Sequence, residues 1–171
     1  GRIKPEITVP GSSIISAARD TSVTSNNCGT TSMSGTSMAT PGAAGLAALV
    51  RQYFVDGFYP AGSANAGNAL TPSSALLRAS LVNSAVTMAN AGTIPGNCQG
   101  WGRTLLDNVL YFGGESRKLW VKDNAAAFPS GSTNQDRVFT FTVGAGESFK
   151  ATLAWTDFPS TPAASPHLNN D

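Results

Sequence analysis

The fold of this 171-residue chain is constrained most by residues 33–45, which read MSGTSMATPGAAG. Serine, threonine and glycine gather here, and an alanine-rich apolar run follows Pro41. The larger apolar side chains that come next recur at spacings of three and four: Leu46, Leu49, Val50, Tyr53 and Phe54. This spacing predicts one buried face of a helix. Because proline is tolerated near the start of a helix, we expect the helix to begin near Thr36 or Ser37.

Ser37 lies among the smallest side chains of this stretch, and two interpretations of its position compete. In the first, Gly42 and Gly45 let the helix pack closely against a neighbour, which would offset their cost of about 1 kcal/mol each relative to alanine. In the second, Ser37 is a nucleophile at a helix N-terminus, where free N–H groups and the helix dipole favour an anion. Gly35 would then allow an unusual backbone angle and leave space for a substrate.

Short extended elements are predicted before this helix. Residues 7–9 form a β-branched run that ends at Pro10-Gly11, which indicates a strand followed by a turn. Residues 14–15 predict a second short extended piece, and residues 20–35, rich in Ser, Thr, Asn and Gly, predict a surface loop.

A second helix is predicted after the Gly- and Asn-rich loop at residues 57–70. Thr71 is its expected N-cap, and Pro72 suits the first helical position. The side chains expected to form its buried stripe are Leu77, Leu81 and Ala85. A Gly-rich loop at residues 90–102 follows.

The pattern changes to period two after about residue 112. Apolar and polar side chains alternate over residues 138–143 and again over residues 149–155, and Gly144-Ala145-Gly146 joins the two runs. This arrangement predicts an antiparallel hairpin. We therefore expect an α/β portion over residues 1–114 and a second, antiparallel β portion over residues 115–171.

Composition and net charge argue against two classes of binding partner. Charged residues make up only 12% of the chain and the net charge is +1, which argues against nucleic acid or an anionic membrane surface as a partner. No apolar run is long enough to predict a transmembrane segment. The chain has no initiator methionine and reads like a central part of a longer polypeptide, so we expect further sequence on both sides.

The residues Gly-Thr-Ser-Met-Ala-Thr-Pro at positions 35–41 closely resemble the nucleophile motif of the subtilisin-like serine peptidases. The flanks agree, because residues 4–11 resemble the strand and turn before that motif and residues 99–107 resemble the end of the peptidase domain. Residues 151–157, with residues 169–171, resemble the β-sandwich that follows this domain in some larger members. The resemblance implies the C-terminal part of an α/β, parallel-sheet peptidase domain, followed by part of an antiparallel β-sandwich.

The resemblance also implies a reaction. Ser37 would be the catalytic nucleophile of an endopeptidase that hydrolyses protein or peptide substrates through an acyl-enzyme. The family order is Asp, His and then Ser, so the triad Asp and His, with the oxyanion Asn, would precede Gly1. The only histidine, His167, follows Ser37 and does not fit the base. Residues 1–171 alone should therefore be inert, and no substrate-binding residue is assigned.

Other chemistries fit the serine less well. Ala39 stands where the α/β-hydrolase elbow has glycine, and no Ser-x-x-Lys pair occurs. A rival function from a different class is a non-catalytic extracellular adhesion or carbohydrate-binding module that retains a degenerate peptidase segment. An Asp-Gly and a His-Gly-Thr type pair in the upstream sequence would decide for the enzyme.

Cofactors are not required for the implied chemistry, and no metal ligands are assigned to it. Asn169, Asn170 and Asp171 offer oxygen ligands that could form part of a structural calcium site. Asp107 and Asp157 follow apolar runs, and capping or turn roles are expected for them.

The two cysteines, Cys28 and Cys98, are expected to form a disulfide, because their number is even and the family is usually exported. The same reasoning predicts a secreted or extracellular protein. Two independent buried thiols are the alternative, and a zinc site has too few ligands.

Overall fold

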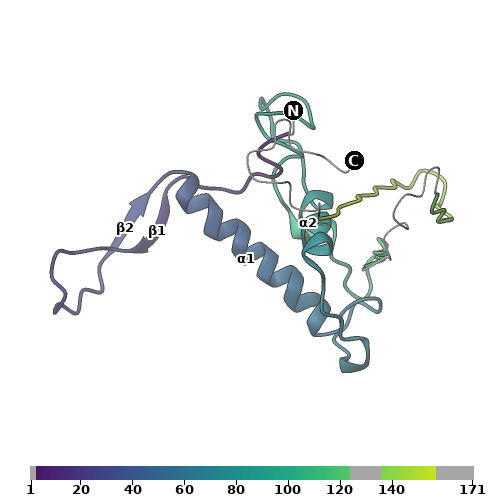
Figure 1. The fold of residues 1–171 in the computed structure, drawn as a ribbon, viewed down its shortest axis with the longest axis horizontal. Coiled ribbons are helices and arrows are strands. Elements are labelled where there is room, and N and C mark those ends of the chain that lie inside the picture. The colour runs from purple at the N-terminus through teal and green to yellow at the C-terminus, as the bar shows by residue number, and fades with distance from the viewer. Residues whose placement is uncertain (1–2, 124–135, 157–171) are drawn as a thin grey trace, which may run out of the picture.

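The computed structural model describes residues 3–123 and 136–156. Within these residues, the chain forms β1 (Ile14–Ala17), β2 (Thr30–Met33), α1 (Thr36–Val55) and α2 (Ser74–Asn83), with two single-turn 3₁₀ helices at Ala66–Asn68 and Leu106–Asn108. The β1–β2 hairpin projects from the N-terminal end of α1, and α2 lies beside α1 toward its other end (Figure 1). The long helix thus connects the hairpin to the main body of the structure.

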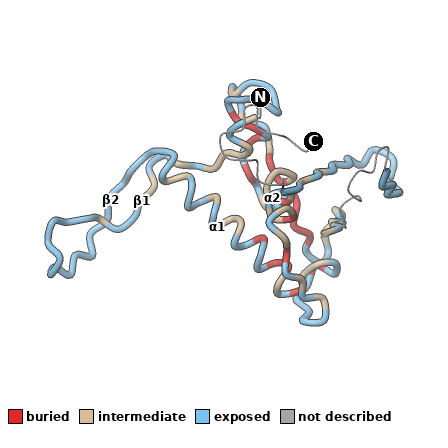
Figure 2. Tube along the Cα trace, viewed as in Figure 1, coloured by how far each residue is buried: buried red, intermediate tan, exposed pale blue. Residues whose placement is uncertain are grey.

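Helix α1 begins where the sequence predicts it, at Thr36, and it contains Pro41 in its second turn. Its buried side chains are Val50, Tyr53 and Phe54, which confirms the C-terminal half of the predicted apolar face. The first two side chains of the predicted face are less buried, since Leu46 is half-buried and Leu49 is 53% exposed. Figure 2 shows this division, with buried residues gathered at the C-terminal end of α1 and exposed ones over the hairpin.

The hydrophobic core joins α1 to α2 and to the segment after residue 106. Its buried members are Val50, Tyr53, Phe54, Leu76, Val109 and Leu110. Tyr53 donates a 2.7 Å hydrogen bond from its hydroxyl to the backbone oxygen of Tyr111, which satisfies both buried polar groups. Its ring also makes an edge contact with that of Phe54, with the ring centroids 5.3 Å apart.

Helix α2 starts three residues later than the predicted N-cap. Ser73, rather than Thr71, caps it, because the Ser73 hydroxyl accepts a hydrogen bond from the Leu76 N–H. Leu76 and Ser80 are the buried residues of the helix. The predicted stripe is confirmed in part: Leu77 and Leu81 are half-buried against the core, and Ala85 is buried just after the helix.

The described β-structure is smaller than the predicted parallel sheet. The sheet within residues 3–123 and 136–156 is the antiparallel pair of β1 and β2, in which Ile14 lies opposite Met33. Strand β2 falls inside the predicted loop at residues 20–35, so that prediction is wrong for residues 30–33. Its residues Thr, Thr, Ser and Met carry a weak strand signal alone and become a strand by pairing with β1.

Parallel pairing does occur close to α2. Thr8 forms a parallel bridge with Arg103, and Val86 forms an antiparallel bridge with the same residue. The Thr8 N–H donates to the oxygen of Gly102 at 2.9 Å, and the Thr8 oxygen accepts from the Thr104 N–H at 3.1 Å. The extended segment predicted at residues 7–9 is therefore paired in parallel, in agreement with an α/β fold.

The predicted hairpin over residues 138–155 forms its turn but not its ladder. The Glu147 N–H donates to the oxygen of Gly144 at 3.1 Å, which closes the turn. No strand forms between residues 136 and 156, although apolar and polar side chains alternate there. The β-sandwich and the division at residue 114 stay predictions, and those about Asp157, His167 and residues 169–171 lie outside the described residues.

No helix among the described residues is both long and apolar enough to cross a membrane.

Candidate active site around Ser37

Ser37 is the second residue of α1 and is exposed. The helix is capped by Gly35, whose backbone angles are φ 154° and ψ 172°. Only glycine adopts this region readily, because a side chain would collide with the backbone. The angle that the sequence predicts for Gly35 is therefore present, and it turns the chain abruptly from β2 into α1.

Free backbone donors lie at this end of α1. The N–H groups of Met38 and Ala39 both donate to the oxygen of Gly35, at 3.1 and 3.3 Å. Within the described residues, the N–H groups of Thr36 and Ser37 have no backbone acceptor, as expected for the first residues of a helix. The Ser37 N–H can thus donate to an oxyanion, which the positive end of the helix dipole would also favour.

Small residues hold the start of α1 against residues 9–11. A Cβ atom on Gly11 would lie 2.7 Å from the oxygen of Gly35 and 2.9 Å from the Cβ of Ala39. A Cβ atom on Gly42 would lie 3.0 Å from Cγ1 of Val9. The packing interpretation therefore holds for Gly42, while exposed Ser37 remains free for chemistry, so the two interpretations are compatible. Gly45 has no such neighbour.

Ser34 is a residue of this site that the sequence analysis missed. Its hydroxyl oxygen accepts a 2.8 Å hydrogen bond from the N–H of Ser13, and it lies 3.5 Å from the Ser12 hydroxyl. Ser13 has a φ of 55°, a left-handed angle that is uncommon for serine. Ser34 and the first residue of the motif, Gly35, form a Ser-Gly pair, a turn signal that could have drawn attention to Ser34.

Two carboxyl groups outside the 33–45 stretch have lowered pKa values. The ammonium of Lys4 donates a hydrogen bond to the Glu6 carboxylate, which lowers the pKa of Glu6 below its usual value. The Ser25 hydroxyl donates to Asp20 in the loop between β1 and β2, which likewise lowers the Asp20 pKa. No histidine occurs in residues 3–123 or 136–156, so the described residues provide no imidazole base for Ser37.

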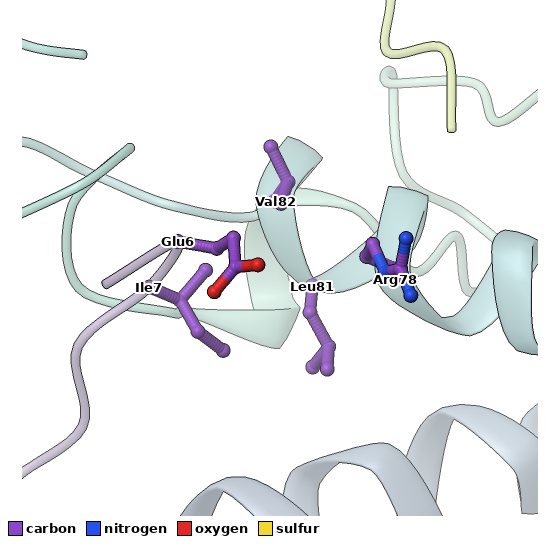
Figure 3. A pocket seen from close by; sticks show the side chains of 5 residues that line it. All are labelled: Glu6, Ile7, Arg78, Leu81 and Val82. Carbon is purple, nitrogen blue, oxygen red and sulfur yellow. The ribbon is translucent and has the colours of Figure 1, made fainter. Parts of the chain in front are cut away.

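A shallow pocket of about 280 Å³ lies between the N-terminal stretch and α2. Figure 3 shows Glu6 and Ile7 on one side, facing Arg78, Leu81 and Val82 of α2 on the other. Its lining contains no residue of the 33–45 stretch. We therefore place the candidate site at the exposed start of α1 rather than in this pocket.

The predicted disulfide is not formed in the structure. Cys28 and Cys98 are free, and both are exposed, so the alternative of two buried thiols is also wrong. The physical reason is the direction of the hairpin: its loop projects away from α1, whereas the loop at residues 90–100 lies beside the N-terminal stretch (Figure 1). Sequence alone could not place these two loops relative to each other.

Asp107 lies exposed in the first turn of the 3₁₀ helix at Leu106–Asn108. The N-cap of this helix is Leu105 and no side chain caps it by a hydrogen bond, so the capping role expected for Asp107 stays a prediction.

Comparison with known proteins supports the family resemblance of this sequence. The model of the subtilase family matches residues 1–102. The chain is 34% identical to the serine protease/ABC transporter B family protein tagD of Dictyostelium discoideum, over 100% of this chain and 12% of that protein. For tagB of the same organism, the identity is 30%, again over 100% of the chain and 12% of the relative.

A third relative, tagA, is 31% identical over 97% of the chain and 10% of its own length. This chain therefore spans about an eighth or less of the proteins it matches. The family match covers more than half of the chain and includes Gly35, Ser37 and the start of α1. The chain belongs to the subtilase family of serine peptidases.

Proposed function

We propose that this chain carries the nucleophile of a serine endopeptidase, with Ser37 as the attacking residue. The observation that carries the proposal is the position of Ser37, exposed at the N-terminal end of α1 beside free backbone N–H groups. A serine hydroxyl in this position has an open approach for a carbonyl carbon and a donor for the oxygen that becomes negative.

The proposed reaction follows acyl transfer. The Ser37 hydroxyl attacks the peptide carbonyl while its proton passes to a histidine base, and the carbonyl oxygen becomes an oxyanion near the Ser37 N–H. The intermediate expels the amine, which takes the proton, and leaves an acyl-enzyme on Ser37. A water molecule then hydrolyses this ester. In the order found in subtilisin, the Asp and His come before the Ser, so we assign them to sequence preceding Gly1.

The substrate and setting belong to the same proposal. A protein or peptide chain is the expected substrate, and the reaction requires no cofactor, although calcium could serve a structural role. The related proteins are named as a serine protease together with an ABC transporter. We infer an extracellular or secretory setting, with the peptidase part joined to further segments of the same polypeptide.

The test compares turnover of the complete protein with that of two variants. Ser37→Ala should lower turnover of a peptide substrate by about 10⁶-fold, the loss seen when the nucleophile of subtilisin is removed. Ser63→Ala changes an exposed loop serine and should leave turnover unchanged. Circular dichroism should show both variants folded. Ordinary activity in a folded Ser37→Ala variant would contradict the proposal and favour a different nucleophile.

A further inference from the structure

Helix α2 lacks charged side chains of its own at either end. It has no acidic residue in its first turn and no basic residue in its last turn. Such residues normally interact favourably with the helix dipole. Two residues that follow the family match, Asp123 and Lys150, occupy these positions instead, at opposite ends of the helix.

Asp123 satisfies the N-terminal end of α2. Its carboxylate accepts a 2.7 Å hydrogen bond from the Ser73 N–H and a 2.5 Å hydrogen bond from the Ser73 hydroxyl. The hydroxyl oxygen of Ser73 in turn accepts a 3.1 Å hydrogen bond from the N–H of Leu76. A negative charge therefore stands at the positive end of the helix, and it also fixes the rotamer of the N-cap.

Lys150 satisfies the C-terminal end. Its ammonium donates to the backbone oxygen of Asn83 and, at 3.0 Å, to that of Ala85. The Asn83 side chain donates back to the Thr152 hydroxyl at 3.0 Å. Partial burial beside these carbonyl groups lowers the pKa of Lys150 below its usual value.

Further contacts join the same segment to the helix and to the core. Arg78 of α2 donates a 3.1 Å hydrogen bond to the backbone oxygen of Trp155, and Figure 1 shows this end of the segment meeting α2. Leu119 and Val121 pack against the core cluster, and the Val121 N–H donates to the Tyr59 hydroxyl at 3.3 Å. These contacts are present although residues 136–156 form no β-ladder.

We propose that the described residues after position 114, namely 115–123 and 136–156, are a docking partner for α2, and that Asp123 and Lys150 clamp the helix by its two ends. Because α2 packs against α1, the clamp also supports α1, the helix whose second residue is Ser37. The surface of α2 thus fits the chain's own downstream segment. It follows that residues 1–114 are not structurally independent of the segment that comes after them.

Amide hydrogen exchange of the complete protein tests this proposal without reference to peptidase activity. Lys150→Met keeps the aliphatic stem and removes the charge and donors, so exchange at residues 80–85 should rise roughly fivefold. Lys150→Arg should restore protection. Lys122→Met changes an exposed lysine of the same segment and should leave exchange in α2 unchanged.

The opposite end of α2 has its own pair of variants. Asp123→Asn should increase exchange at residues 74–77 by a similar factor, whereas Asp136→Asn, at an exposed aspartate, should not. Unchanged exchange at α2 in both Lys150→Met and Asp123→Asn would overturn the proposal. We expect a smaller rise over residues 45–55 of α1, which pack against α2. A rise there equal to that at the ends of α2 would also overturn the proposal, because it would indicate global destabilisation rather than release of the helix ends.

Discussion

The backbone oxygen of Gly11 accepts a 2.8 Å hydrogen bond from the N–H of Gly35, the residue that caps α1 two positions before Ser37. This bond ties the turn after the N-terminal extended stretch to the start of α1. The close approach needs glycine at both positions, for different reasons. Gly35 provides its backbone angle, and Gly11 provides space.

Replacing Gly11 tests this relationship. In Gly11→Ala the new Cβ would meet the Gly35 oxygen at 2.7 Å, so the start of α1 must shift. We expect a loss of about 1–3 kcal/mol in the free energy of unfolding, as for other overpacked sites, together with a fall in peptidase turnover.

The control for Gly11→Ala is Gly45→Ala, which places the same methyl group where no atom lies within 4 Å. Since glycine is unfavourable inside a helix, this control should stabilise the protein by up to about 1 kcal/mol. Chemical denaturation measures both variants. Equal stability of Gly11→Ala and the unchanged protein would show that the contact is not tight.

Tyr53 makes a second testable contact. Tyr53→Phe removes the hydroxyl that donates to the buried Tyr111 oxygen at 2.7 Å and leaves that oxygen unpaired. The expected loss in the free energy of unfolding is about 1–3 kcal/mol. Tyr59→Phe is a comparison variant, because Tyr59 is only half-buried and accepts a weaker 3.3 Å bond, so its loss should be smaller.

The pH dependence of stability should also change in Tyr53→Phe. Burial raises the pKa of Tyr53 above its usual value of 10.0, so the folded state holds the proton more tightly than the unfolded state. This contribution is complete below the unfolded pKa and is lost as the pH rises from there through the folded pKa. The unchanged protein should thus lose stability more steeply above pH 10 than Tyr53→Phe does, and parallel curves would contradict this assignment.

Met38 should make the peptidase sensitive to peroxide. It follows Ser37 directly and its sulfur would lie 3.7 Å from a Cβ atom on Gly35, so a polar sulfoxide would crowd the oxyanion position. Turnover should fall by roughly tenfold or more on oxidation. Met38→Leu should remove this sensitivity, whereas Met33→Leu, on the exposed hairpin, should keep it. Complete oxidation of Met38 with full activity would rule the effect out.

The cysteines should react as two free thiols. Both Cys28 and Cys98 are exposed, so a thiol reagent should modify each without denaturant or reductant. Cys28→Ser and Cys98→Ser should each lower the number of reactive thiols by one. A mass-spectrometric peptide that links the two residues by a disulfide would show instead that the sequence-based pairing was right.

Local sequence signals predicted the parts of the fold that depend on neighbouring residues. The start of α1 follows from the motif and the spacing of its apolar side chains, and the structure agrees. The sequence predicts the N-cap of α2 two residues too early, because Thr71 and Ser73 are both good caps. Asp123, 50 positions away along the chain, favours Ser73 by bonding to it. Contacts of this kind are not visible in a local pattern.

The same limit explains what was missed around Ser37. Strand β2 has no apolar alternation, and it forms because Ile14–Ala17 pairs with it. Ser34 accepts a hydrogen bond from the N–H of Ser13, which lies just before the other strand of the hairpin. The expected disulfide required two loops to meet, and their positions depend on how the hairpin leaves the body of the structure. The start of α1 was predictable here, whereas the relative placement of distant segments was not.

The central claim is that Ser37 is the nucleophile, and covalent labelling tests it most directly. A fluorophosphonate probe reacts with an activated serine, so treatment of the complete protein followed by peptide mapping should place one adduct on Ser37. Prior heat denaturation should abolish labelling, because the helix start and the base must be in place. An adduct on another serine of the folded, active protein, with Ser37 unmodified, would contradict the account.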